Sequence, residues 1–450
     1  MNIESLKKNI EGDVSQPAES TYSDYQQTYF LATVAAKTPI AVVSPATTAD
    51  IAAAIGWAKQ SGVTVVVRGG GHGAFSSADA EMVLDLSKHF RYASLDGEHI
   101  VAGGGATMGT LLAAGASTNR VVPVGAAAGP GMGLALHGGI GWLCRRYGLT
   151  IDHLEAVELI LPGGNVVTLD SSGSYDDLWW AVRGAAPNFG VVSQATFRTH
   201  QVSLMGFHRY VVPAKFLATV LSHAESVGDE MDVSMACSRE PGEDASLLIY
   251  VSIRGTQAEV TSSKTTADEF VAGITNSVSA SDHSVAHYRD SPEFDFPQAP
   301  TPEPRPVQLY GSSPFLAPDA DLEHVAEVVL TSMAAAPFPV RVNFEQMGGQ
   351  IGNVAPRATP FWNREANWST TITGVWPDVA GKQQTADWVN GTVHELEADT
   401  CGSYIVEAHP EEADVGEYVA ASFGENLPRL REIKRRIDPD NVFGSYYPLT

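Results

Sequence analysis

The sequence predicts a chain that mixes helices and strands along its whole length. The first 200 residues alternate between strand-like and helix-like segments, and the middle third, from about 205 to 400, combines alternating strands with amphipathic helices. The 450 residues are enough for two or three domains with a large core. These observations favour a mixed α and β protein and exclude an all-helical bundle.

The first part of the chain contains well-marked elements. Thr48 or Asp50 can cap a helix over 51–59, which Gly62 ends. Apolar or alternating runs then predict strands, and the segment that begins at Met108 reads as helical. The strands are expected at 63–68, 82–86, 99–102, 154–161 and 165–169, and the second helix at 108–114.

The middle and the end of the chain are less regular. Strands are expected at 246–254 and 341–347, and the proline-rich segment 292–318 is expected to be a loop or surface excursion. A basic helix over 427–434 precedes the C-terminus. Four tryptophans are either core aromatics or one wall of a pocket for a flat substrate: Trp362, Trp368, Trp376 and Trp388.

The most informative segment is the glycine run that follows the predicted strand 63–68. Arg68 is followed by three glycines, and His72 comes directly after them. Without Cβ atoms, this backbone can adopt positive φ and lie against a flat or phosphorylated ligand. Arg68 adds a positive charge, and His72 adds a nucleophilic nitrogen. The loop therefore predicts a cofactor site.

The glycines do not form a dinucleotide fingerprint of the Rossmann type. That fingerprint needs G-x-G-x-x-G at the start of a helix and an acidic residue about 20 positions later. The segment after His72 continues as a loop, and the match at 104–109 is too loose. Nicotinamide binding in that manner is therefore not expected.

Composition excludes several other classes of protein. There are 28 Lys and Arg against 52 Asp and Glu, which gives a net charge of −24. Such a chain repels phosphate backbones and anionic lipid, so neither nucleic-acid nor membrane binding is expected. No apolar run reaches the roughly 20 residues of a membrane span, and no signal peptide is recognised, so a cytoplasmic location is expected. Cys144, Cys237 and Cys401 are expected to be reduced thiols.

Four segments together resemble the berberine-bridge-enzyme-like branch of the vanillyl-alcohol-oxidase flavoprotein family. They occur in the family's order: Arg68 to His72, Gly133 to Trp142 with Tyr147 to Leu149 and Asp152, Leu178 to Val192, and Ile437 to Phe443. The resemblance implies an α+β, two-domain, PCMH-type FAD-binding fold whose substrate domain is an antiparallel sheet flanked by helices. It implies an FAD-binding domain at 1–205 with its core at about 36–205, a substrate domain at 206–400, and a C-terminal strap at 401–450.

The resemblance also implies FAD bound covalently through a ring nitrogen of His72, which would fix the flavin and raise its potential as a hydride acceptor. Relatives often have a second link through a cysteine, but an ungapped count gives Ala126 there, so a single link is predicted. The residues expected to contact the cofactor are Arg68, Gly69, Gly70, Gly71, His72, Gly73, Gly125, Gly129, Gly133, Gly138, Gly139, Gly141, Gly148, Asp152, Gly190, Val192 and Asn441.

Oxidation of a substrate also needs a base for the departing proton, and the candidates are Tyr404, Glu407 and Glu345. The alternatives are a hydrogen-bonded core tyrosine and solvent-facing glutamates. His137 either touches the flavin or substrate or has a structural role. Where relatives have Val-Gly near the oxygen-reacting carbon of the flavin, this chain has Gly129-Pro130, which leaves oxidase and dehydrogenase behaviour both open.

The expected function is an FAD-dependent oxidoreductase. It oxidises an alcohol, amine or phenolic position of a small organic molecule, which we expect to be a secondary metabolite, and it passes electrons to molecular oxygen. One alternative keeps the flavoprotein scaffold for a redox-neutral cyclase or pericyclase, because the Tyr-x-Asn pattern of relatives is absent after Tyr404. A flavin-storing protein is a third, non-enzymatic reading.

Overall fold

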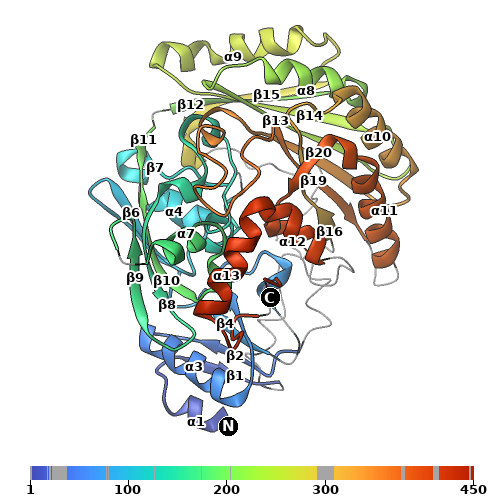
Figure 1. The fold of residues 1–450 in the computed structure, drawn as a ribbon. Coiled ribbons are helices and arrows are strands. Elements are labelled where there is room, and N and C mark those ends of the chain that lie inside the picture. Colours follow the sequence, from blue (N-terminus) through green and yellow to red (C-terminus); the bar gives the residue numbers. More distant parts are fainter. Residues whose placement is uncertain are drawn as a thin grey trace.

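In the computed structural model, the described chain forms three sheets of four, five and nine strands and a separate two-stranded pair, and the largest sheet lies across the top of the molecule in Figure 1. The structure describes residues 3–17, 19, 22, 38–77, 79, 81–125, 127–173, 175–202, 204–290, 309–376, 381–408, 415–444 and 447–449. Within these ranges, helices and mostly antiparallel sheets combine in the α+β architecture that the sequence analysis expected.

A four-stranded sheet at the N-terminal end delivers the glycine loop. Its strand order is β1 (Asp13–Ser15), β2 (Ala41–Ser44), β4 (Met82–Asp85) and β3 (Val65–Arg68), with β2 and β3 both parallel to β4. Helix α3 (Thr48–Ser61) connects β2 to β3. Its cap is Thr47 rather than Thr48, and Asp50 completes a capping box from the third helical position. Short α1 (Ile3–Lys7) packs below.

The second sheet has five antiparallel strands. In order, they are β5 (Ala93–Asp96), β6 (His99–Gly103), β10 (Val191–Arg198), β8 (Leu154–Ile160) and β9 (Val166–Asp170). Beside this sheet lie α4 (Met108–Ala114), α5 (Met132–Ala135), α6 (Cys144–Tyr147), α7 (Asp176–Ala185) and the pair β7 (Arg120–Val121) and β11 (His200–Gln201).

The third sheet is antiparallel with nine strands, which matches the expected substrate-domain architecture. Four helices cover its outer face: α8 (Leu217–Glu225), α9 (Gln257–Ala272), α10 (Leu322–Ala335) and α11 (Gly381–Glu395). The strand order is β15 (Ala280–His287), β12 (Leu204–Pro213), β14 (Ser246–Ile253), β13 (Met231–Arg239), β18 (Val340–Gln346), β19 (Trp368–Val375), β17 (Pro314–Leu316) and β20 (Thr400–Ser403), with β16 (Leu309–Ser312) also paired to β19.

Strand alternation gives this sheet two different faces. In β18, Val342 and Phe344 join the core beneath the helices, whereas Asn343 and Glu345 point to the opposite face. Because successive side chains of a strand alternate between faces, the polar pair in β18 must lie on the side away from the helices. That side faces the N-terminal half of the chain, where the glycine loops lie.

The loop or surface excursion expected at 292–318 is wrong in part. Residues 309–312 and 314–316 form β16 and β17, and most of their side chains are buried in the sheet. Proline content suggested a loop, but Pro314 stands at the first position of its strand, where a missing N–H costs little. Residues 291–308 lie outside the described part of the chain.

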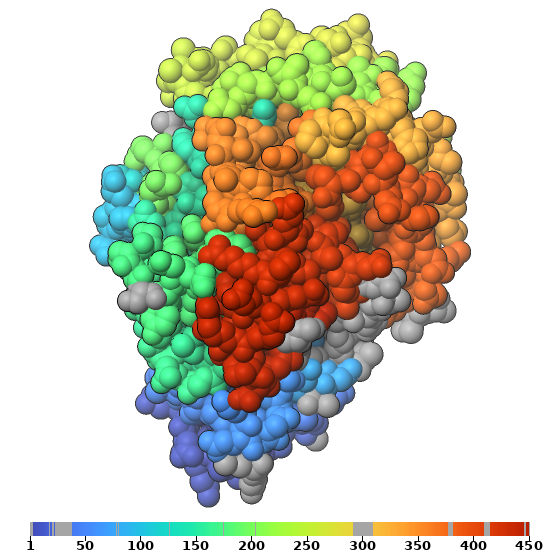
Figure 2. All heavy atoms as spheres, viewed as in Figure 1, coloured from blue at the N-terminus to red at the C-terminus, as the bar shows by residue number. Residues whose placement is uncertain are grey.

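The C-terminal segment returns to the N-terminal half through α12 (Val415–Phe423) and α13 (Leu427–Ile437). Figure 2 shows these residues, in red, packed against green N-terminal residues and orange residues of the large sheet. After α13, the Val65 N–H donates to the carbonyl of Val442, so the segment is bonded to the strand that carries the glycine loop.

Candidate functional site

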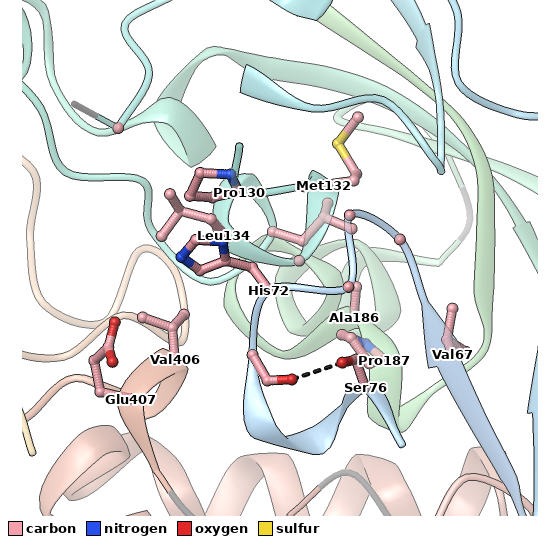
Figure 3. Close-up of a pocket in the computed structure, with 18 of the residues that line it drawn as sticks. Val67, His72, Ser76, Pro130, Met132, Leu134, Ala186, Pro187, Val406 and Glu407 are labelled. Carbon is pink, nitrogen blue, oxygen red and sulfur yellow. Dashed lines mark hydrogen bonds between the residues drawn. The ribbon is translucent and has the colours of Figure 1, made fainter. Parts of the chain in front are cut away.

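A cavity of about 300 Å³ lies between the glycine-rich loops and the inner face of the nine-stranded sheet. Its size falls at the lower end of the range for small-molecule sites. One wall consists of glycine backbone and mostly apolar side chains from the N-terminal half, with His72 among them. The other wall consists of polar side chains from β18, β19 and the turn after β20. Figure 3 shows part of both walls.

The glycine wall is built by two loops that pack without side chains. A Cβ placed on Gly70 would lie 2.7 Å from the backbone nitrogen of Gly131, and one on Gly131 would lie 2.2 Å from that of Gly70. Real Cβ atoms do not approach backbone so closely, so both positions require glycine. Gly71 has φ of +67°, which turns the chain so that His72 reaches the cavity.

His72 lines the cavity beside Pro130 and Leu134, and Val406 and Glu407 lie across from it in Figure 3. Burial lowers the pKa of His72 to about 4, so the imidazole is neutral at pH 7. A neutral imidazole has a ring nitrogen with a free electron pair, which is the form that can act as a nucleophile. A Cβ built on Gly129 would lie 3.9 Å from Nδ1 of His72.

Arg68 lies beneath this loop and does not line the cavity. Its guanidinium lies 2.7 Å from the position of a Cβ built on Gly71, and its Nε lies 3.9 Å from Oδ2 of Asp85. Burial raises the pKa of Asp85, and the charge of Arg68 partly opposes that rise. Arg68 therefore supports the loop from behind through the buried Asp85.

Two carboxyl groups face the cavity from the opposite wall. Glu345 comes from β18, and Glu407 comes from the short helical turn Ile405–Glu407. Burial raises the pKa of Glu407 to about 7, and burial together with the charge of Glu407 raises the pKa of Glu345 to about 7. Two carboxyls that interact in this way titrate as a pair, with one able to hold a proton while the other is ionised.

Tyr404 also lines the cavity, but its oxygen is already engaged. The backbone N–H of Gly139 donates to the Tyr404 hydroxyl at 2.8 Å, and the ring packs against Phe315 and Phe361. Burial, with a smaller contribution from the nearby Glu345, raises the pKa of this phenol far above its ordinary value. The hydroxyl can donate its proton in a hydrogen bond, but it is a poor proton acceptor.

The inner face of the sheet adds two neutral polar groups that the sequence analysis did not identify. Asn343 is two residues from Glu345 on the same strand, and Thr371 is its register partner on β19. The period-2 pattern of the expected strand 341–347 was enough to place Asn343 beside Glu345. Thr371 had no such signal, because strand register depends on long-range pairing.

The predicted residues divide into two groups. Those that line the cavity are Gly69, Gly70, Gly71, His72, Gly73, Gly125, Gly133, Gly190, Val192, Glu345, Tyr404 and Glu407. Those that do not are Arg68, Gly129, Gly138, Gly139, Gly141, Gly148, Asp152 and Asn441. Ala126, the position of the missing second link, lies outside the described residues.

The second group supports the first from behind. A Cβ on Gly141 would lie 2.0 Å from the carbonyl oxygen of Val124, and Asp152 accepts from the buried Arg364 at 2.7 Å. The Gly139 carbonyl accepts from Cys144 Sγ and Thr150 Oγ1. Asn441 lies in the C-terminal turn with φ of +52°. At Gly141, close packing against Val124 therefore requires a glycine.

Other candidates lie away from the cavity lining. His137 is buried, and its ring nitrogens contact the carbonyl of Gly133 at 2.6 Å and the hydroxyl of Tyr447 at 3.1 Å. Trp368 and Trp376 are buried, and none of the four clustered tryptophans lines the cavity.

In the described ranges the three cysteines are free thiols, and no helix is long and apolar enough to cross a membrane.

The glycine wall fits FAD. Nine glycines line the cavity within the described chain, and they leave bare backbone for a flat ring and a pyrophosphate: Gly69, Gly70, Gly71, Gly73, Gly104, Gly125, Gly131, Gly133 and Gly190. The buried side-chain amide of Asn188, beside the cavity-lining Pro187, has no hydrogen-bond partner among the described residues. Such a site suits a large planar cofactor with many acceptors.

Comparison with known families identifies two segments. Residues 39–170 match the FAD binding domain family, and residues 403–446 match the family described as berberine and berberine like. The first segment contains the glycine loop with His72, and the second contains Tyr404 and Glu407.

Whole-chain comparisons agree with these matches. The FAD-linked oxidoreductase YgaK of Bacillus subtilis is 26% identical over 419 residues, covering 88% of this chain and 87% of the relative. The xylooligosaccharide oxidase of Thermothelomyces thermophilus is 25% identical over 448 residues, covering 91% and 86%. The solved structure of BBE-like 1 from Physcomitrella patens superposes with a TM-score of 0.85 and 23% identity over the full length of both chains.

Proposed function

We propose that this chain oxidises an alcohol, amine or phenolic group of a small organic molecule in the cavity between His72 and the two glutamates. The proposal is supported by its matches to the FAD binding domain and the berberine and berberine like families and by its similarity to FAD-linked oxidoreductases. The single observation that carries this proposal is the opposition of the two walls, with a neutral histidine on a glycine loop facing two carboxyls. The name of the xylooligosaccharide oxidase supports a small hydroxylated molecule as one substrate class.

His72 would hold the cofactor through one ring nitrogen, and the glycine wall would contact it through backbone groups. FAD, when bound, supplies a two-electron acceptor that takes a hydride from the substrate carbon. The protein would contribute a fixed ring position, since a covalent link removes the freedom of the cofactor to leave or rotate. The dry glycine wall would also keep water away from the reacting carbon.

The proton released in the oxidation would go to Glu345 or Glu407. A base works best when its pKa is near the working pH, and burial raises the pKa of both carboxyls to about 7. Tyr404 is unsuited to this role, because its oxygen already accepts from Gly139 and its pKa is far above the ordinary value. We assign Tyr404 the role of a hydrogen-bond donor that orients the reacting oxygen or nitrogen.

Anaerobic mixing of the holoenzyme with a panel of alcohols, amines and phenols tests this function. An oxidoreductase loses its yellow colour with a substrate, and readmitted oxygen restores the colour with release of hydrogen peroxide. Turnover of a substrate with no loss of colour would instead support the redox-neutral cyclase. Loss of colour that oxygen does not reverse would indicate a dehydrogenase with another electron acceptor.

A further inference from the structure

We propose that the substrate of this site is a protonated amine whose nitrogen is held between the carboxyl groups of Glu345 and Glu407. The inference rests on the proposed function and narrows its three substrate classes to one. It follows from three features of the cavity: where the carboxyls come from, what charge surrounds them, and which neutral groups lie beside them.

The two carboxyls reach the same space from separate elements. Glu345 projects from the middle of the nine-stranded sheet, where it pairs in register with Ser234 and Ser369. Glu407 ends the helical turn that follows β20, and Figure 3 shows its carboxyl in the cavity near His72 and Val406. An ammonium group offers up to three N–H donors, so it can bond to both carboxyls at once.

The charge of the lining residues favours a cation. Among the described residues that line the cavity, none is arginine or lysine, and the only ionisable nitrogen belongs to His72, which is neutral. Both carboxyls are buried, and no positively charged described residue lowers the pKa of either one. A bound cation would compensate this buried negative charge, a neutral alcohol would not, and an anion would be repelled.

The remaining polar groups suit a nitrogen that also carries a substituent. Asn343 and Thr371 lie side by side on the sheet next to Glu345, and Tyr404 retains its own proton to donate. These neutral groups can orient a hydroxyl or ring oxygen elsewhere in the substrate without opposing the charge of the ammonium. On the opposite wall the polar side chains are His72, which is neutral, and Ser76, whose hydroxyl donates to the carbonyl of Gly73.

The chemistry balances with the groups present. One carboxylate takes a proton from the ammonium, which leaves a neutral amine with a free electron pair. That pair forms the C=N bond as the adjacent C–H bond breaks, and the hydride goes to the bound FAD. The product is an iminium ion, which water converts to a carbonyl compound and an amine after release. With oxygen as electron acceptor, the hydride and the carboxyl proton leave as hydrogen peroxide.

The test measures the affinity of the holoenzyme for three probes that differ only in head group: benzylamine, benzyl alcohol and benzoate. Calorimetric titration without oxygen at about pH 8 keeps benzylamine protonated and the carboxyls ionised. We expect benzylamine to bind at least about tenfold more tightly than benzyl alcohol, and benzoate not to bind. Equal affinities, a preference for the alcohol or the anion, or no binding of benzylamine overturn the inference.

Variants of the two glutamates test whether these residues cause the preference for benzylamine. Glu345→Gln and Glu407→Gln, made separately, should each reduce the preference for benzylamine, while their retained yellow colour reports folding. Glu397→Gln removes one charge from a side chain that is 77% exposed, and it should leave the preference unchanged. A preference that survives both cavity variants contradicts the assignment.

The failure of this inference is distinguishable from failure of the proposed function. If an alcohol or phenol reduces the flavin while benzylamine has no advantage, the oxidoreductase function stands and the amine assignment is wrong. If the purified protein holds no flavin, the proposed function itself is wrong.

Discussion

The two walls of the cavity differ in the residues that build them and in how those residues are spaced in the sequence. The glycine wall is rich in residues without side chains, and its residues come in short runs of sequence, such as Gly69 to Gly73 and Pro130 to Leu134. The sheet wall depends on side chains, and its residues come from positions as distant as Asn343, Thr371 and Glu407. A cofactor shared by many proteins can be recognised by a local motif, whereas a substrate specific to one protein is recognised by scattered groups.

The largest expected effect comes from the sheet wall. Glu345→Gln and Glu407→Gln each keep the side-chain shape but remove a proton acceptor, and loss of a general base lowers rates by about 10²–10⁴-fold. Stopped-flow measurement of anaerobic flavin reduction checks this. Asn343→Asp is the matched control, since it adds an acceptor to the same strand face, and it should not rescue Glu345→Gln.

The next effect tests how the C-terminal segment supports the glycine wall. Lys434 is buried and donates to the carbonyl of Asn188 at 2.8 Å and to Asp438 at 2.7 Å. Lys434→Met leaves the Asp438 charge buried without its partner, which destabilises a protein by about 3–5 kcal/mol. Urea unfolding measures this loss, and the purified variant should also carry less flavin per protein, because Asn188 adjoins the cavity-lining Pro187.

Lys59 provides the matched control for Lys434. It pairs with Asp440 at 2.8 Å, but both side chains are about half exposed. Exposed pairs contribute little because water screens them, so Lys59→Met should unfold at the same urea concentration as the wild type. An equal loss in the two variants would mean that burial of the Lys434 pair is unimportant.

The close contact between the two glycine loops of the glycine wall is tested by adding a single methyl group. Gly70→Ala places a Cβ 2.7 Å from the nitrogen of Gly131, so the two loops must separate. We expect the flavin content per protein to fall by about tenfold, which corresponds to about 1.4 kcal/mol. Gly56→Ala adds the same methyl on α3 with no atom within 4 Å, and it should stabilise the protein by about 0.5–1 kcal/mol.

The smallest effect is the pH dependence of the sheet wall. The base must be ionised to act, so the rate constant of flavin reduction should rise as pH increases toward about 7 and level off above it. The charge of Glu407 raises the pKa of Glu345, so Glu407→Gln should move the break in the profile to lower pH. A profile that is flat from pH 5 to 9 would exclude both carboxyls as the base.

The same contrast explains what the sequence could predict. The elements α3 and β3 and the cavity position of His72 followed from caps, apolar runs and glycines that are local in sequence. The glycine signal could not separate ligand approach at Gly70 from plain close packing at Gly141, because both need a missing side chain.

The features of the site that depend on non-local contacts could not be predicted from the sequence. The inward turn of Arg68 toward Asp85 and the pairing of Thr371 with Asn343 depend on strand order, which no local pattern encodes. The loop predicted from proline content was wrong at β16 and β17, which are strands. The candidate bases were named, but only the structure distinguishes the engaged hydroxyl of Tyr404 from the two open carboxyls.

The most direct test of the account is to precipitate the purified protein with acid, digest it, and identify the peptide that carries the yellow colour. The account predicts that the colour stays with the pellet and with a single peptide that contains His72, and that His72→Ala releases it to the supernatant. Colour in the wild-type supernatant, or on a peptide without His72, would contradict the central claim that this histidine holds the flavin opposite the two carboxyls.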